Sequence, residues 1–123
     1  MQIQGILWAG VRVAEPENAA RFFSDTLGLE IAKRDAGAGF TLFRLPSGQE
    51  FELLGPQSRW YAVHEHPVVV GFQVADVSES RRELEAKGVP FVSETAGDAA
   101  TGQWCYFRGP GGVLFEICSE GSH

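Results

Sequence analysis

Residues 107–118 read Phe-Arg-Gly-Pro-Gly-Gly-Val-Leu-Phe-Glu-Ile-Cys, and residues 43–54 read Phe-Arg-Leu-Pro-Ser-Gly-Gln-Glu-Phe-Glu-Leu-Leu. Six of these twelve positions are identical between the two stretches, in the same order and at the same spacing. An internal repeat of this kind indicates that one structural unit occurs twice in the chain. Each copy predicts a strand, a tight turn that contains Pro and Gly, and a second strand in which a glutamate, Glu52 or Glu116, stands between apolar residues.

The residues around each hairpin extend the repeat into two βαβββ modules, which predict an α+β fold. Module one covers residues 5–54, a linker covers 55–67, and module two covers 68–118. Pro16 and Gly28 mark the start and end of the first helix, while Asp76 and Gly88 mark those of the second. We expect strands at residues 4–13, 29–33, 40–45, 49–54, 68–74, 89–93, 103–108 and 113–118, and a loop at 94–102.

The composition excludes several classes of protein. The 123 residues carry a net charge of −6 and contain no run of basic residues, so we expect neither nucleic acid nor membrane as a partner. Cys105 and Cys118 are too few for a disulfide framework and are interpreted as small buried hydrophobic residues. No targeting segment is recognised, which predicts a cytoplasmic location, and residues 121–123, Gly-Ser-His, are interpreted as an expression-tag remnant.

On these features the chain resembles the vicinal oxygen chelate superfamily, which contains glyoxalase I, extradiol dioxygenases, fosfomycin resistance enzymes and bleomycin resistance proteins. The resemblance covers residues 5–118. It rests on the two modules, on the helix with Phe22-Phe23 and Leu27-Gly28-Leu29, and on the Phe-Glu-Leu and Phe-Glu-Ile strands. It implies a curled, partly open, mixed sheet of eight strands around a cleft, with the helices outside. It also implies a homodimer.

The resemblance further implies four metal-ligand positions, on the first and last strand of each module. Glu52 and Glu116 match the last-strand positions, whereas Trp8 and Val69 stand where histidines are usual. We therefore expect no metal cofactor, because two carboxylates without nitrogen ligands make a poor transition-metal site. A divalent ion held by the two glutamates is the alternative. A shift in register could bring His64 or His66 of the linker to the site.

The alternation of side chains along a strand predicts which residues face the cleft. Glu52 and Glu116 oppose their apolar neighbours, so both should point away from the helix-packed core. Aromatic rings with a few charges beside them suit planar small molecules. The other candidate ligand-binding residues are Trp8, Arg12, Gln73, Trp104, Tyr106 and Arg108. The alternatives are a structural ion pair for Arg12, and core or dimer contacts for the aromatic residues.

These observations favour a protein that binds a small organic molecule, a drug or a metabolite, as antibiotic resistance proteins do, without a complete metal site. The alternative is a lyase, isomerase or dioxygenase of the same superfamily with a degenerate ligand set. In that case Glu52 or Glu116 is the candidate catalytic base, because a carboxylate in a cleft can remove a proton next to a carbonyl. A structural dimer module, with Trp8 filling the cleft, is the third hypothesis.

Overall fold

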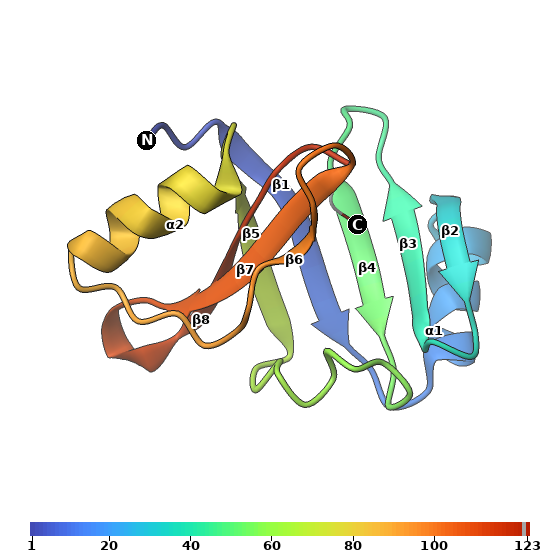
Figure 1. Cartoon of the computed structure of the whole chain (residues 1–123). Helices are drawn as coiled ribbons and strands as arrows, with labels where there is room; N and C mark the ends of the chain where they lie inside the picture. Colours follow the sequence, from blue (N-terminus) through green and yellow to red (C-terminus); the bar gives the residue numbers. More distant parts are fainter. Residues whose placement is uncertain (122) are drawn as a thin grey trace. The chain divides into compact units, whose positions relative to one another are not determined.

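The computed structural model describes residues 1–121 and residue 123, and they form two compact units. Unit 1 consists of Met1–Trp8 and Val70–His123, and unit 2 consists of Ala9–Val69. Strand β1 (Gly5–Arg12), drawn in blue in Figure 1, contributes its first half to unit 1 and its second half to unit 2. Neither unit therefore coincides with one of the sequence repeats.

Unit 2 packs one helix on a small antiparallel sheet. Helix α1 (Pro16–Arg21) continues into the π-helical turn η1 (Phe22–Thr26), and the strands are β2 (Glu30–Asp35), β3 (Phe40–Arg44) and β4 (Glu50–Leu54). The strand order is β2-β3-β4-β1. Ala20 of α1 packs against Phe43 and Leu53, which are both 0% exposed. These contacts place the core of unit 2 between α1 and one face of β3 and β4.

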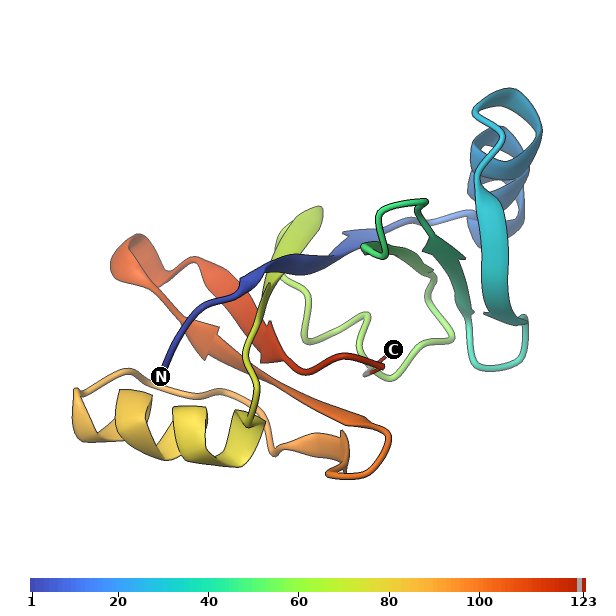
Figure 2. The same cartoon turned by 90° about the horizontal axis from the view of Figure 1, so that it is seen from above.

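Unit 1 repeats this plan with a longer helix. Its elements are β5 (Val68–Gln73), α2 (Val77–Ala86), β6 (Ala96–Asp98), β7 (Gly102–Arg108), the 3-10 turn η2 (Pro110–Gly112) and β8 (Leu114–Cys118). The strand order is β1-β5-β8-β7-β6, with β5 and β8 parallel and β8, β7 and β6 antiparallel. Val77 of α2 packs on Cys105 and Ile117, so the helix covers one face of these strands (Figure 2).

The ends of both helices follow the sequence signals. A side-chain oxygen of Asp76 accepts a hydrogen bond from the backbone N–H of Glu79 at 2.9 Å, which caps the start of α2. Gly28 and Gly88 adopt φ values of +71° and +87°, a backbone conformation that favours glycine after a helix. The π-helical turn at the end of the first helix places the Phe23 ring 4.8 Å from that of Phe51 in the core.

The predicted α+β class, with eight strands in a mixed sheet and two βαβββ modules, is confirmed. Two details of module two are wrong. Residues 89–93 form only an isolated bridge between Phe91 and Phe107, and the third strand of the module is β6, inside the segment predicted as a loop. Pro90 has no backbone N–H to donate to a ladder, which interrupts the earlier segment.

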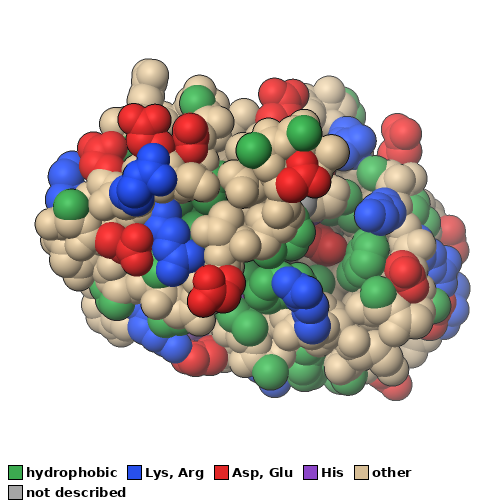
Figure 3. Space-filling view, viewed as in Figure 1, with side chains coloured by type: hydrophobic (Ala, Val, Ile, Leu, Met, Phe, Trp, Pro, Cys, Tyr) green, Lys and Arg blue, Asp and Glu red, His purple; other side chains and the backbone are tan. Residues whose placement is uncertain are grey.

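Charges of both signs are mixed on the surface. On the face shown in Figure 3, lysine and arginine side chains lie among aspartates and glutamates. Helix α2 carries two such pairs at helical spacing, Arg81 with Glu85 and Lys87 with Glu83, each with an N–O distance of 3.6 Å. None of the helices in the described part of the chain is long and apolar enough to cross a membrane.

Candidate functional site

The face of unit 1 that α2 does not cover carries a group of polar and aromatic side chains. Tyr106 lies opposite Glu116 and Trp104 opposite Cys118 in the β7–β8 ladder, so these four residues share one face. In the β5–β8 ladder Gly71 lies opposite Glu116. A Cβ atom at Gly71 would lie 3.3 Å from Cβ of Trp8, so the Trp8 side chain lies on the same face. We call Trp8, Trp104, Tyr106, Glu116 and Cys118 the Glu116 cluster.

The Glu116 cluster is built into the interior of unit 1. Glu116 and Cys118 are 0% exposed, and Trp8 and Tyr106 are 1% exposed. The backbone of Gly71 makes room for them, because a Cβ atom at that position would lie 2.7 Å from Oε1 of Glu116 and 3.1 Å from Sγ of Cys118. A glycine in β5 is therefore what allows the carboxylate and the thiol to lie side by side.

The imidazole of His123 occupies the space beside Glu116. Its Nε2 atom lies 2.9 Å from Oε1 of Glu116, and its ring centroid lies 4.5 Å from that of Trp8 at an interplanar angle of 19°. The Trp104 ring lies 4.9 Å away at 40°. Among the described residues, none hydrogen-bonds to the second carboxylate oxygen of Glu116, Oε2, although this atom is buried. The carboxylate is thus satisfied on one side only, which is costly for a buried polar atom.

The repeat keeps the glutamate, as Glu52 in unit 2 and Glu116 in unit 1, but changes the side chains beside it. Leu42 and Leu54 of unit 2 stand at the repeat positions of Tyr106 and Cys118, and both leucines are buried. The same backbone plan therefore carries aliphatic side chains in one unit and a phenol and a thiol in the other. Packing alone does not require the polar set, which makes the Glu116 cluster the candidate site.

Two of the residues expected in the cleft belong to unit 2. Arg12 donates a hydrogen bond from Nη1 to the backbone carbonyl of His64 at 2.7 Å, and its guanidinium lies 4.2 Å from the centre of the Tyr61 ring. Glu52 is 8% exposed and, since Phe51 and Leu53 pack towards α1, lies on the opposite face of β4. Arg12 thus helps to fix the linker.

Gln73 and Arg108 lie at the ends of their strands in unit 1. The backbone carbonyl of Gln73 accepts a hydrogen bond from the N–H of Gln4 at 2.8 Å. Arg108 donates from Nη1 to the carbonyl of Gly112 at 3.0 Å and so closes the hairpin turn between β7 and β8. The Arg108 side chain, which the sequence predicts as a ligand contact, is thus engaged by the hairpin turn.

The linker histidines belong to unit 2. His64 is 0% exposed, and its backbone N–H donates to the carbonyl of Trp60 at 3.0 Å. His66 lines a pocket of about 290 Å³ together with Arg12, Glu65 and Pro67. A backbone turn thus holds His64, whereas His66 borders a pocket with the guanidinium of Arg12.

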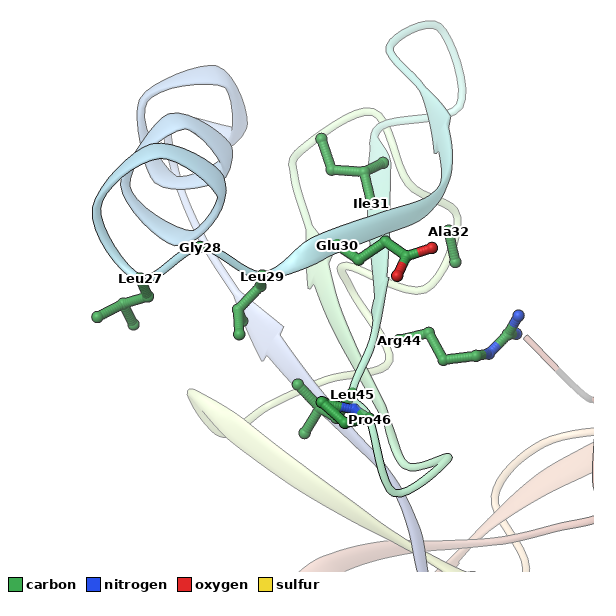
Figure 4. A pocket seen from close by; sticks show the side chains of 9 residues that line it. All are labelled: Leu27, Gly28, Leu29, Glu30, Ile31, Ala32, Arg44, Leu45 and Pro46. Atoms are coloured by element: carbon green, nitrogen blue, oxygen red, sulfur yellow. The ribbon is translucent and has the colours of Figure 1, made fainter.

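A larger pocket of about 740 Å³ is lined entirely by unit 2 (Figure 4). It lies where the end of the first helix meets β2 and the end of β3. Leu27 is 55% exposed and Ile31 39% exposed, so the apolar part of this pocket is open to solvent. The charged lining residues are Glu30 and Arg44, and Arg44 also pairs with the buried carboxylate of Glu50 at 3.0 Å. The lining of this pocket thus combines exposed apolar side chains with two charged ones.

The four positions that carry metal ligands in the resembling superfamily do not form a ligand set in this chain. Trp8 offers only an N–H donor and Val69 offers no ligand atom, so two of the four positions cannot coordinate a metal. A different group of donors exists in unit 1, where ligand atoms of Glu116, Cys118 and His123 lie within 4.8 Å of one another. Only Glu116 belongs to both sets.

Three residues of this site escape the sequence reasoning. His123 falls in the segment interpreted as a tag remnant, and Cys118 in the class of small buried hydrophobic residues. Gly71 gives no signal except that it interrupts an apolar strand, where glycine often marks a close approach. The spacing of Glu116 and Cys118, two positions apart on one strand, would have placed the thiol on the carboxylate's face.

The second thiol, Cys105, lies on the face that α2 covers. Burial raises the pKa of the Cys105 thiol to about 11, because the thiolate would lose its hydration there. Cys105 is therefore protonated at neutral pH and unreactive, as expected for a packing residue.

Comparison with known proteins gives one family match. The model of the Glyoxalase/Bleomycin resistance protein/Dioxygenase superfamily matches residues 5–117. No curated protein matches. Similar solved structures include methylmalonyl-CoA epimerase from Mycobacterium tuberculosis, with a TM-score of 0.73, 22% identity, and coverage of 95% of this chain and 88% of that one. A superfamily member from Vibrio splendidus 12B01 has a TM-score of 0.67 and 19% identity, covering 96% and 99%. At these identities the likeness shows the fold alone.

Proposed function

Since the chain belongs to the Glyoxalase/Bleomycin resistance protein/Dioxygenase superfamily, we propose that it binds a small planar organic molecule, a drug or a metabolite, at the Glu116 cluster. One observation carries this proposal: a flat ring, that of His123, stacks on the buried indole of Trp8 with 4.5 Å between ring centroids. Stacked aromatic pairs gain about 0.5–1.5 kcal/mol beyond burial of their surface. Binding of this kind needs no metal.

A screen of planar small molecules by thermal shift, with and without divalent metals, tests this proposal. We expect at least one compound to raise the melting temperature without added metal, and Trp8→Leu to abolish that shift while keeping apolar volume. Trp60→Leu, in unit 2, is the matched control and should leave the shift unchanged. The proposal fails if no planar compound stabilises the protein, or if every stabilising compound requires a divalent ion.

A second candidate function is a lyase or isomerase of the superfamily type. Glu116, Cys118 and His123 favour it, because a carboxylate, a thiolate and an imidazole are all zinc ligands. Metal analysis of protein purified without chelator separates the two candidates, since stoichiometric zinc or nickel supports the enzyme.

We further propose that the protein is cytoplasmic and that it forms a homodimer. In unit 2 the apolar side chains of Phe22, Leu27 and Ile31 are between 39% and 55% exposed, around the end of the first helix and β2. Exposed apolar groups at adjacent positions are typical of subunit contacts. Analytical ultracentrifugation tests this, with Leu27→Glu expected to shift a dimer towards the monomer.

A further inference from the structure

The two carboxylate oxygens of Glu116 are not used equally. Oε1 lies 2.9 Å from Nε2 of His123, whereas none of the described residues hydrogen-bonds to the buried Oε2. A carboxylate has room for two parallel N–H donors, the arrangement that a guanidinium or amidinium group provides. The imidazole supplies one donor and leaves the second place open.

The aromatic rings beside the imidazole limit which chemical groups can supply the second N–H donor to Glu116. Trp8 and Trp104 both lie within 5 Å of the imidazole centroid, at 4.5 Å and 4.9 Å. A group that reaches both carboxylate oxygens in this space has to be flat and in the plane of the stacked ring. An exocyclic amino group next to a ring N–H meets this condition, because both N–H bonds then point the same way.

We propose that the Glu116 cluster recognises planar nitrogen heterocycles that carry two adjacent N–H donors, of the 2-aminoimidazole class. His123 occupies the same place as an internal competitor with a single donor. This inference rests on the proposed function and names its ligand class. The ring stacks on Trp8 beside the tilted ring of Trp104, and the two donors bind Oε1 and Oε2 of Glu116. A ring with no N–H donor would leave a buried carboxylate unsatisfied and should bind at least about tenfold more weakly.

Three single-ring probes of similar size test this class by NMR titration of the indole N–H signals. The probes are 2-aminoimidazole with two adjacent donors, imidazole with one, and 1-methylpyrrole with none. In the His123→Ala variant we expect 2-aminoimidazole to bind at least about tenfold more tightly than 1-methylpyrrole, with imidazole between them. In the unaltered chain all binding should be weaker, because His123 competes.

The outcomes separate this inference from the proposal beneath it. If 1-methylpyrrole binds as tightly as 2-aminoimidazole, flat-ring binding stands and carboxylate recognition is overturned. If none of the three rings binds to His123→Ala, both are overturned. Probe binding that disappears with a chelator would assign the site to a metal and overturn the inference. Glu116→Gln should remove the preference for 2-aminoimidazole. The probe series decides the question without that variant if it does not fold.

Discussion

Gly71→Ala is the most direct test of how the site is built. The added methyl group would lie 2.7 Å from Oε1 of Glu116, 3.1 Å from Sγ of Cys118 and 3.3 Å from Cβ of Trp8. The first of these distances is well below van der Waals contact, and the Glu116 and Cys118 side chains are both 0% exposed, so they are held by the packing around them. Forcing an extra methyl group into a packed interior costs about 1–3 kcal/mol of the free energy of unfolding.

Urea unfolding followed by tryptophan fluorescence measures this cost. With a slope of about 1.5 kcal/mol/M, a loss of about 2 kcal/mol lowers the midpoint by about 1.3 M. Gly37→Ala is the matched control, because a Cβ atom there makes only an ordinary 3.5 Å contact with Asp35 and the backbone needs no left-handed conformation. Equal midpoints for the two variants would refute the placement of Glu116 and Cys118 against β5.

Three further perturbations probe the two cores and one helix cap. Phe43→Ala empties a site that is 0% exposed and should lower the free energy of unfolding by about 3–5 kcal/mol, whereas Val113→Ala, at a position 42% exposed and outside the proposed dimer contact, should cost less than about 1 kcal/mol in the same urea experiment. Asp76→Ala removes the cap on the N–H of Glu79 and should cost about 0.5–2 kcal/mol by calorimetry; no change would mean that the cap is not formed. Burial raises the pKa of Cys105 from 9.0 to about 11, so the thiol keeps its proton to a higher pH in the native state than in the unfolded state. The contribution of the buried neutral thiol to stability is therefore lost as pH rises from 9 towards 11. The stability advantage over Cys105→Ala should shrink across that range, and a constant difference would contradict the assignment.

The sequence predicts the frame of this protein better than its site. The duplicated hairpin and the capping residues depend on local chemistry, so the elements around them are found where expected. Strand parity likewise places Glu116 opposite the face covered by α2. β6 forms where Gly97 adopts φ +78°, and a Cβ atom there would lie 2.1 Å from the carbonyl oxygen of Gly102. That requirement comes from a neighbouring strand, and no local pattern reveals it.

The site itself depends on contacts between distant parts of the sequence. His123 stacks on Trp8 although more than a hundred residues separate them in the sequence, and no sequence motif links the two. Alternation gives the face on which a side chain lies but gives no information on which ring fills the space beside it. The unequal use of the two Glu116 oxygens therefore becomes visible only in three dimensions.

The division of β1 between the units has a consequence for synthesis on the ribosome. Unit 2 is one continuous segment, so its long-range contacts can form once Val69 has left the exit tunnel. Unit 1 joins the first eight residues to a segment that begins at Val70, and the amino group of Met1 pairs with Glu83 at 2.9 Å. The first half of β1 can therefore pair with β5 only after that later segment has been synthesised, so unit 1 depends on contacts of longer range in the sequence than unit 2 does.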